Sequence, residues 1–334
     1  MQADRSSKSS RLAPSWPSFI SGAVAGILSK TTVAPLDRAK ILLQTRSHLL
    51  PSHASRTVSL IRHLHRTEGF RSLFAGNLST IIRIAPYGAI SFSSYEYIKQ
   101  LLDAHDPRAN PLRGIAAGSL AGACAVACTY PLDVLRTRLA YESKALNHNP
   151  GTGIGAPHGV QETSAHIRAH LLSSRPRMVD MARIISVSGG PRAWFAGLGT
   201  TLAGIVPYAG TNFFTNDWLK AHAALFFSSA TSGDTDSSVR SSLAPPIPVW
   251  ARMVCGGLAG ALGQGVAYPL DVVRRTQQVR PGVAFHHVVQ EIWSRAGIRG
   301  FYRGITINFA KVVPMVAVSF TTYDVLKNWL SQYA

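Results

Sequence analysis

The chain has 334 residues, of which only 15% are charged, below the roughly 25% usual in soluble proteins. Its 34 Lys and Arg residues outnumber 16 Asp and Glu residues, which gives a formal net charge of +18. This balance argues against an ordinary soluble enzyme and indicates an anionic partner: nucleic acid, lipid or a small solute. The three cysteines, Cys124, Cys128 and Cys255, have neither the number nor the spacing of a disulfide framework or a zinc site.

Six long segments with almost no charge follow one another along the chain. Each is about 20 residues long, which suits a helix crossing a hydrocarbon core of about 30 Å. Their only charged residues are Lys30, Arg83 and Lys311. We therefore predict an all-α membrane protein with six transmembrane helices; six buried helices of a soluble protein would leave these three cations without a purpose. The segments are 16–36, 75–95, 114–132, 196–216, 253–270 and 305–323.

The segments belong to three tandem copies of one unit. Each copy contains a proline followed by an acid at +2 and a base at +5, then an aromatic-x-Gly sequence, and an acid 20 residues after that glycine. The prolines are Pro35, Pro131 and Pro269. The predicted organisation is a tail at 1–15, repeats at 16–106, 111–223 and 249–331, a polar loop insertion at 143–176 and a linker at 228–248.

The basic residues are sorted between the two sides of the predicted membrane. Segments 38–73, 133–193 and 271–303 carry 7, 8 and 6 Lys and Arg residues. By the positive-inside rule these loops face the more internal compartment, so both termini face the other way.

The triple P-x-[DE]-x-x-[KR], the aromatic-x-Gly and the later [DE]-x-x-[KR] resemble the mitochondrial carrier family over residues 16–331. The resemblance implies three repeats related by a pseudo-threefold axis around a central cavity, with short matrix helices at about 56–67, 178–187 and 285–296. It also implies a multi-pass protein of the mitochondrial inner membrane, with both termini toward the intermembrane space. We expect a monomer in the bilayer, with cardiolipin as a candidate lipid partner.

In such a carrier, proline bends would bring three helix ends together, so that acids and bases from neighbouring repeats pair in a ring. This matrix gate would join Asp37 with Arg136, Asp133 with Arg274, and Asp271 with Lys40. Gln44 and Gln278 resemble the glutamine braces that support the ring, whereas Ala140 stands at the equivalent place in the second repeat.

A second ring is expected at the opposite, cytoplasmic end. Its pairs would be Glu96 with Lys220, Asp217 with Lys327, and Asp324 with Lys99. Tyr95 and Tyr323 resemble tyrosine braces, and Asn216 replaces the aromatic residue in the second repeat. Two such gates that open in turn are the basis of alternating access.

The three remaining cations predict the substrate site. Lys30, Arg83 and Lys311 would line a water-filled positive cavity, because a lone charge in lipid is costly. At the register of Arg83 and Lys311 the second repeat has Gly204 and Ile205, a smooth wall for a flat ring, and Tyr208 follows one turn later and could stack on it. These three positive charges and one smooth wall suit a solute with several phosphates.

Within the family, "TYPLDVLRTRLAYE", "PYAGTNFFT", "CGGLAGALGQ" and "SFTTYDVLK" resemble the coenzyme A carrier subgroup, including its Graves-disease-carrier-like members. The resemblance implies transport of coenzyme A, in exchange for an adenine nucleotide. An adenine-nucleotide carrier and a thiamine pyrophosphate carrier are the alternatives within transport.

Other classes of protein are less well supported. The segment "SKTT" at 29–32 lacks the glycines of a phosphate-binding P-loop, since Ser29 and Val24 occupy their positions. A nucleic-acid-binding protein would carry its positive charge on one exposed stripe, whereas here it is sorted by loop. We expect no enzymatic turnover, metal, cofactor or nucleic-acid partner; a transport-inactive receptor or a proton leak stays open.

Overall fold

The computed structural model describes residues 16–45, 57–102, 111–142, 177–230 and 248–332. The described chain is helical, with no β-strand among these residues, so the all-α prediction is confirmed. Five long helices, together with a sixth span that is divided into two helices near the C-terminus, correspond to the six predicted spans. They are α1 (Trp16–Thr45), α3 (Asn77–Leu101), α4 (Pro111–Tyr141), α7 (Leu198–Ala230), α8 (Val249–Val279), and α10 (Ile305–Ala310) followed by α11 (Val312–Ser331).

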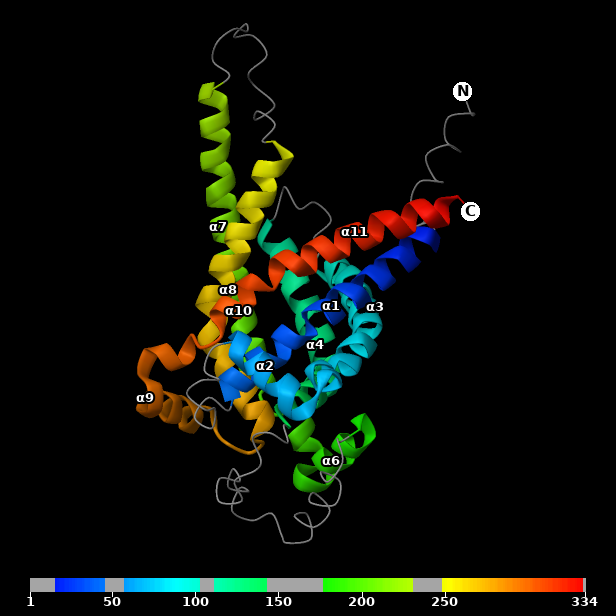
Figure 1. The fold of residues 1–334 in the computed structure, drawn as a ribbon. Coiled ribbons are helices and arrows are strands. Elements are labelled where there is room, and N and C mark those ends of the chain that lie inside the picture. Colours follow the sequence, from blue (N-terminus) through cyan, green and yellow to red (C-terminus); the bar gives the residue numbers. More distant parts are fainter. Residues whose placement is uncertain (1–15, 46–56, 103–110, 143–176, 231–247, 333–334) are drawn as a thin grey trace, which may run out of the picture.

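The long helices associate in pairs that link one repeat to the next. Helix α3 packs along α4, α7 along α8, and α11 along α1, so the last repeat closes onto the first. Figure 1 shows α7 beside α8 and α11 beside α1, with the two pairs diverging from a common region. The predicted arrangement of three tandem repeats is therefore present.

The short elements gather at one end of the bundle. They are α2 (Thr57–Glu68), the 3₁₀ helix η3 (Phe70–Phe74), α6 (Met178–Trp194) and α9 (Phe285–Phe301). Apolar side chains of α2, α6 and α9 pack against the C-terminal parts of α1, α4 and α8, respectively. Because the long helices α1, α4 and α8 also contact one another here, we call this the closed end. We call the opposite end of the bundle the open end. Helix α11 has no fully buried side chain.

Hydropathy alone identifies fewer spans than the architecture does. Among the described helices, two segments are apolar and long enough to cross a membrane: Ala116–Tyr141, and Ile305–Ser331 across α10 and α11. The other long helices contain polar residues such as Lys30 and Asp37 of α1, which lower their mean hydropathy. Helices that line a wet interior need only one apolar face.

The predicted boundaries need some corrections. Helix α7 continues to Ala230, so the first residues of the predicted 228–248 linker are helical. Helices α6 and α9 run past their predicted ends, with kinks at Gly190 and Gly297, which have positive φ. Helix α2 ends one residue later than predicted. The tail 1–15, the insertion 143–176 and the linker beyond Ala230 up to 247 lie outside the described residues.

The prolines of the repeated motif lie inside continuous helices. Helices α1, α4 and α8 run without interruption through Pro35, Pro131 and Pro269, and the bend at these residues stays a prediction. The structure draws attention to a second set of prolines, which the sequence analysis missed. Pro86, Pro207 and Pro314 each lie ten residues after the aromatic-x-Gly glycine, in α3, α7 and α11.

Candidate functional site

Acids and bases of the three proline motifs meet at the closed end. The Arg136 guanidinium lies 2.5 Å from Asp37, Lys40 Nζ lies 3.0 Å from Asp271, and Arg274 forms an ion pair with Asp133. Each pair joins two different repeats, and together they connect α1, α4 and α8 in a cycle. The structure thus brings together the six residues of the expected matrix gate.

Every acid of this ring also contacts a second cation. Arg83 Nη1 lies 2.8 Å from Asp133 Oδ1, and Lys311 Nζ lies 2.8 Å from Asp37 Oδ1. The motif spacing assigned no acid to Arg83 or Lys311, and these two contacts are visible only in the structure. Both side chains are about one-fifth to one-quarter exposed, so their ion pairs are only partly shielded from water.

The third acid, Asp271, has a different second cation. By repeat symmetry its partner would come from position 204, but Gly204 has no side chain. Arg275, one turn along the same helix, approaches Asp271 at 3.4 Å instead. The threefold pattern of two cations per carboxylate is therefore maintained by a residue from another position.

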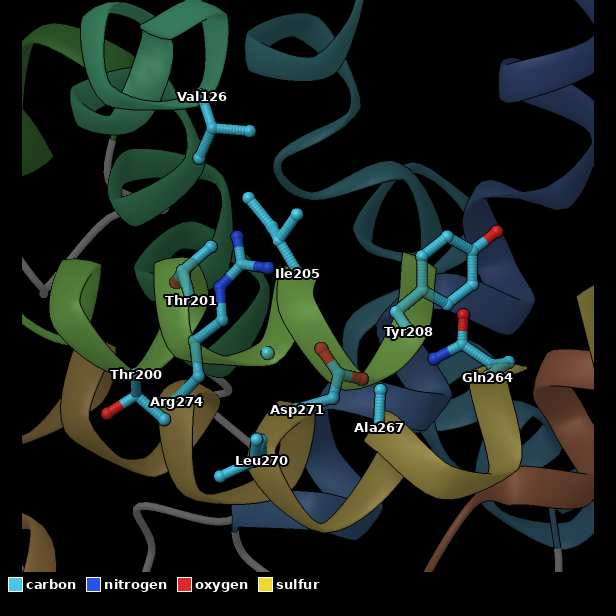
Figure 2. Close-up of a pocket in the computed structure, with 11 residues that line it drawn as sticks. Val126, Thr200, Thr201, Ile205, Tyr208, Gln264, Ala267, Leu270, Asp271 and Arg274 are labelled. Atoms are coloured by element: carbon cyan, nitrogen blue, oxygen red, sulfur yellow. The ribbon is translucent and has the colours of Figure 1, made fainter. Parts of the chain in front are cut away.

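A cavity of about 240 Å³ lies beside Gly204, between α7, α8 and α4. Figure 2 shows Ile205 and Tyr208 from α7 and Asp271 and Arg274 from α8 around this space. The predicted wall residues, Gly204 and Ile205, and the predicted stacking residue Tyr208 thus adjoin two residues of the closed-end ring. The remaining lining residues are Val126, Thr200, Thr201, Gln264, Ala267 and Leu270.

Lys30, the third predicted cavity cation, makes a weaker contact. Its Nζ lies 3.5 Å from Met315 Sδ, and no carboxylate of the described residues forms an ion pair with it. The side chain is half-buried inside the bundle, where α1 packs along α11. Of the three predicted cavity cations, Lys30 is therefore the one that forms no ion pair with a described carboxylate in this conformation.

The two glutamines are held by tyrosines that the sequence analysis did not identify. Gln278 Nε2 donates to Asp133 Oδ2 at 3.0 Å and to the Tyr130 hydroxyl at 3.2 Å. Gln44 Nε2 donates to the Tyr268 hydroxyl at 3.0 Å rather than to an acid of the ring. A tyrosine directly before the motif proline, present in repeats two and three, was the available signal.

The glycine of each aromatic-x-Gly sequence lies against the motif of the next repeat. Gly76, Gly197 and Gly304 all have φ near +80°, which L side chains rarely adopt. A Cβ at Gly76 would lie 2.7 Å from the Arg136 carbonyl oxygen, and one at Gly197 would lie 3.0 Å from that of Arg274. These glycines are therefore needed both for their backbone conformation and for the close approach between repeats.

The second predicted ring is not formed in this conformation. Among the described residues no ion pair joins the acids Glu96, Asp217 and Asp324 to Lys99, Lys220 or Lys327, and all three acids are exposed. Of the two tyrosine braces, Tyr323 contacts Lys327, whose Nζ lies 5.6 Å from the ring centroid. Tyr95 packs near Ile98 of its own helix. One end of the bundle is thus held by ion pairs while the other is not.

Comparison with known proteins gives three consecutive matches to one family. The family model described as "Mitochondrial carrier protein" matches residues 12–106, 107–225 and 245–334. "Solute carrier family 25 member 16" of Homo sapiens is 35% identical, over 93% of this chain and 87% of the relative.

Two further relatives have similar coverage. "Mitochondrial carrier protein CoAc1" of Zea mays is 36% identical, over 92% of this chain and 85% of the relative. "Mitochondrial carrier protein LEU5" of Saccharomyces cerevisiae is 32% identical, over 93% and 89%. Since the matches extend over nearly the whole sequence and coincide with the three repeats, the chain belongs to the mitochondrial carrier family.

Proposed function

We propose that this carrier moves a phosphate-rich, nucleotide-type solute, most specifically coenzyme A, across the mitochondrial inner membrane by alternating access. The closed end faces the matrix and both termini face the intermembrane space. Exchange against an adenine nucleotide completes the cycle. The carrier works as a monomer in the bilayer, with cardiolipin among its lipids.

The main support for this proposal is that Asp37 and Asp133 each contact two cations, one from the expected gate and one from the predicted substrate site. Arg83 and Lys311 each hold an acid that also pairs with a base of the closed-end ring. Phosphate groups entering from the open end would compete for these two cations. Asp133 and Asp37 would then each lose one of two partners, which weakens the ring at the moment when the solute is bound.

Such coupling gives binding energy a direct route to the conformational change. A ligand shifts a two-state equilibrium only by its difference in affinity for the two states. Partly exposed ion pairs contribute about 0–1 kcal/mol each, and more where water is excluded. A solute with several phosphates can therefore offset the loss of two such pairs.

The cavity beside Gly204 could hold a flat ring of the solute. Because Gly204 lacks a side chain, the space that a third cation would fill is empty and is bordered by Ile205 and the ring of Tyr208. An adenine ring placed there would lie within the same interior as the cations that bind its phosphates. The relative's printed name, "CoAc1", agrees with the coenzyme A assignment drawn from the sequence strings.

The test is uptake into liposomes containing the purified carrier and a candidate counter-substrate. Labelled coenzyme A, ADP and thiamine pyrophosphate are compared under identical gradients. We expect coenzyme A uptake at least on the order of tenfold faster than that of the other two, which corresponds to about 1.4 kcal/mol of discrimination. Equal or faster uptake of ADP or thiamine pyrophosphate would transfer the assignment to that solute.

A further inference from the structure

A glutamine outside the predicted site residues lies in the wall of the cavity beside Gly204. Gln264 of α8 lines this cavity together with Gly204, Ile205 and Tyr208 of α7. Figure 2 shows its side chain extending from α8 toward the ring of Tyr208. An amide group therefore adjoins the wall that is proposed to hold a flat ring of the solute.

The place of Gln264 is fixed by a close approach between two helices. A Cβ on the preceding residue, Gly263, would lie 3.0 Å from the Tyr208 carbonyl oxygen and 3.2 Å from Asn212 Cβ. Small residues at a helix contact allow such an approach of two backbones. Because α8 lies directly against α7 here, Gln264 and Tyr208 border the same space from neighbouring helices.

Gln264 also occupies the same register as a predicted cavity residue. Lys30, Val126 and Gln264 each lie five residues before the motif proline of their repeat. Val126 lines the same cavity as Gln264, and Lys30 is the cation predicted at this position in the first repeat. The three equivalent positions thus carry an ammonium, an aliphatic group and an amide, which makes the interior chemically different on its three sides.

Four other polar side chains of the cavity already have protein partners. The hydroxyl groups of Thr200 and Thr201 donate to protein oxygens at 2.6 and 2.8 Å. Asp271 and Arg274 belong to the ion pairs of the closed end. By contrast, the half-buried amide of Gln264 forms no hydrogen bond with any residue that the structure describes. Its donor and its acceptor are therefore available to a solute.

A free amide beside a stacking surface can recognise the edge of a heteroaromatic ring. The side chain of Gln264 offers an NH₂ donor next to an acceptor oxygen. Adenine has the complementary pair, since its exocyclic amino group donates and a neighbouring ring nitrogen accepts, and glutamine pairs with adenine in this way where proteins read bases. Stacking on Tyr208 does not distinguish between bases, because every base has a π face.

We propose that Gln264 is a specificity-determining residue of the substrate site, which recognises the edge of an aminopurine ring while Tyr208 stacks on its face. This inference rests on the proposed transport of a nucleotide-type solute and adds the contact by which the ring is selected. Arg83 and Lys311 bind the phosphates in the same interior, whereas Gln264 contacts the ring. A change of Gln264 therefore alters the preference between rings more than the affinity for phosphates.

Two ligands that differ in one amino group test this contact. ADP and purine-riboside 5′-diphosphate have the same sugar and phosphates, but the second lacks the 6-amino group. The rise in the apparent Tm of the detergent-purified full-length protein with increasing ligand gives an apparent Kd for each. We expect ADP to bind on the order of tenfold more tightly, as for one hydrogen bond to a group that is otherwise left unpaired.

Gln264→Met removes the amide and keeps a side chain of similar volume. This variant should bind the two ligands about equally, because nothing then pairs with the amino group. Gln290→Met, at an exposed glutamine of α9 outside the cavity, is the matched control and should keep the full preference for ADP. A preference that Gln264→Met leaves unchanged would overturn the assignment.

Gln264→Glu tests the same contact by a reversal of preference. A carboxylate accepts hydrogen bonds and donates none, so it suits guanine, whose Watson–Crick edge has two neighbouring donors. The added negative charge should weaken the binding of every anion, and the measurement is therefore the ratio of the Kd for GDP to the Kd for ADP. We expect this ratio to fall on the order of tenfold relative to the unaltered protein. An unchanged ratio would contradict recognition of the ring edge by Gln264.

The outcomes separate this inference from the proposed function. If ADP and coenzyme A raise Tm but the preference between rings does not depend on Gln264, a nucleotide-type solute remains supported and the role of Gln264 is refuted. If neither raises Tm, both proposals fail.

Uptake into proteoliposomes adds a readout that a merely structural role would not move in the same way. The apparent KM of Gln264→Met for coenzyme A should rise while the maximal rate stays close to that of the unaltered protein. A lower maximal rate with an unchanged KM would assign Gln264 a structural role and refute the inference.

Discussion

At the residue scale, the closed end depends on carboxylates that serve two partners. Asp37 and Asp133 each bind one base of the gate ring and one cation proposed to bind solute. Removing either acid would leave two partly buried cations without a carboxylate, whereas removing one cation leaves one ion pair intact. Substitutions of the cations are therefore the cleaner probes of transport.

Arg83→Ala and Lys311→Ala should each reduce coenzyme A uptake to background while the folded protein remains in the membrane. Both remove a charge that is proposed to bind phosphate but keep the Arg274–Asp133 and Arg136–Asp37 pairs. Uptake into proteoliposomes and the Tm in detergent are the measurements. Arg71→Ala, an exposed cation of η3, is the control; uptake at the unaltered rate by the Arg83 or Lys311 variant would remove them from the substrate site.

Gly76→Ala should lower the stability of the protein by about 1–3 kcal/mol, since alanine must adopt a strained φ there. Its Cβ would also meet the Arg136 carbonyl oxygen at 2.7 Å. Gly88→Ala is the matched control, because it lies inside α3 with ordinary φ and open space around the added Cβ. A drop in apparent Tm for Gly88→Ala as large as that for Gly76→Ala would contradict the explanation.

At the scale of elements, the closed-end ring joins helices of different repeats. Its contribution to stability comes from ion pairs between helices, so neither residue of a pair can be considered alone. Lys40 illustrates this, since its ammonium is almost fully buried and contacts both Asp271 and Asn308. The tyrosines before the prolines extend the same connection. Tyr268 accepts from Gln44 of repeat one and donates to the Arg303 carbonyl of its own repeat at 3.0 Å.

The double variant Lys40→Met/Asp271→Asn should be destabilised by less than the sum of the destabilisations of the two single variants. Asp271→Asn leaves the buried Lys40 ammonium without a carboxylate, and Lys40→Met leaves Asp271 with Arg275 as its remaining cation; the second change relieves both imbalances. We expect a coupling of about 0.5–3 kcal/mol in a double-mutant cycle followed by thermal unfolding. Strict additivity would show that the two side chains do not stabilise the closed end together.

At the scale of the whole molecule, the two ends of the bundle differ, as expected for one of the two states of the proposed alternating-access cycle. The closed end is held by ion pairs and the six residues of the second ring are apart, which is the arrangement expected of a carrier open on one side only. The second ring remains a prediction about the other state, in which the open end would close.

Cysteines at Asp217→Cys and Lys327→Cys should be cross-linked by a short reagent much faster during exchange than in the absence of solute. Closure of the open end during the transport cycle would bring α7 and α11 together there. The native Cys124, Cys128 and Cys255 are first replaced by alanine. The same cysteine pair in an Arg83→Ala background is the control, and solute-dependent cross-linking in that background would separate closure from binding at Arg83.

Much of the fold could be predicted because the pattern is repeated. Three prolines, three aromatic-x-Gly glycines and their fixed offsets predicted the repeats and the partners of Asp37, Asp133 and Asp271. Single residues that break the symmetry were harder to interpret. Gly204 stands where the other repeats have a cation, and this predicted a smooth wall. The contact of Arg275 with Asp271, one turn away on the same helix, was not predicted, because the other repeats have no equivalent pair.

The sequence by itself determined that this is a three-repeat helical carrier, because spacing along a helix decides which residues share a face and repetition brings equivalent faces together. Only the tertiary structure decided which cation each acid binds, and that Arg83 and Lys311 belong to the closed-end network. Long side chains choose partners by distances between helices from different repeats. Those distances arise from packing and from the state of the gates, and they have no counterpart in the spacing of residues along the chain.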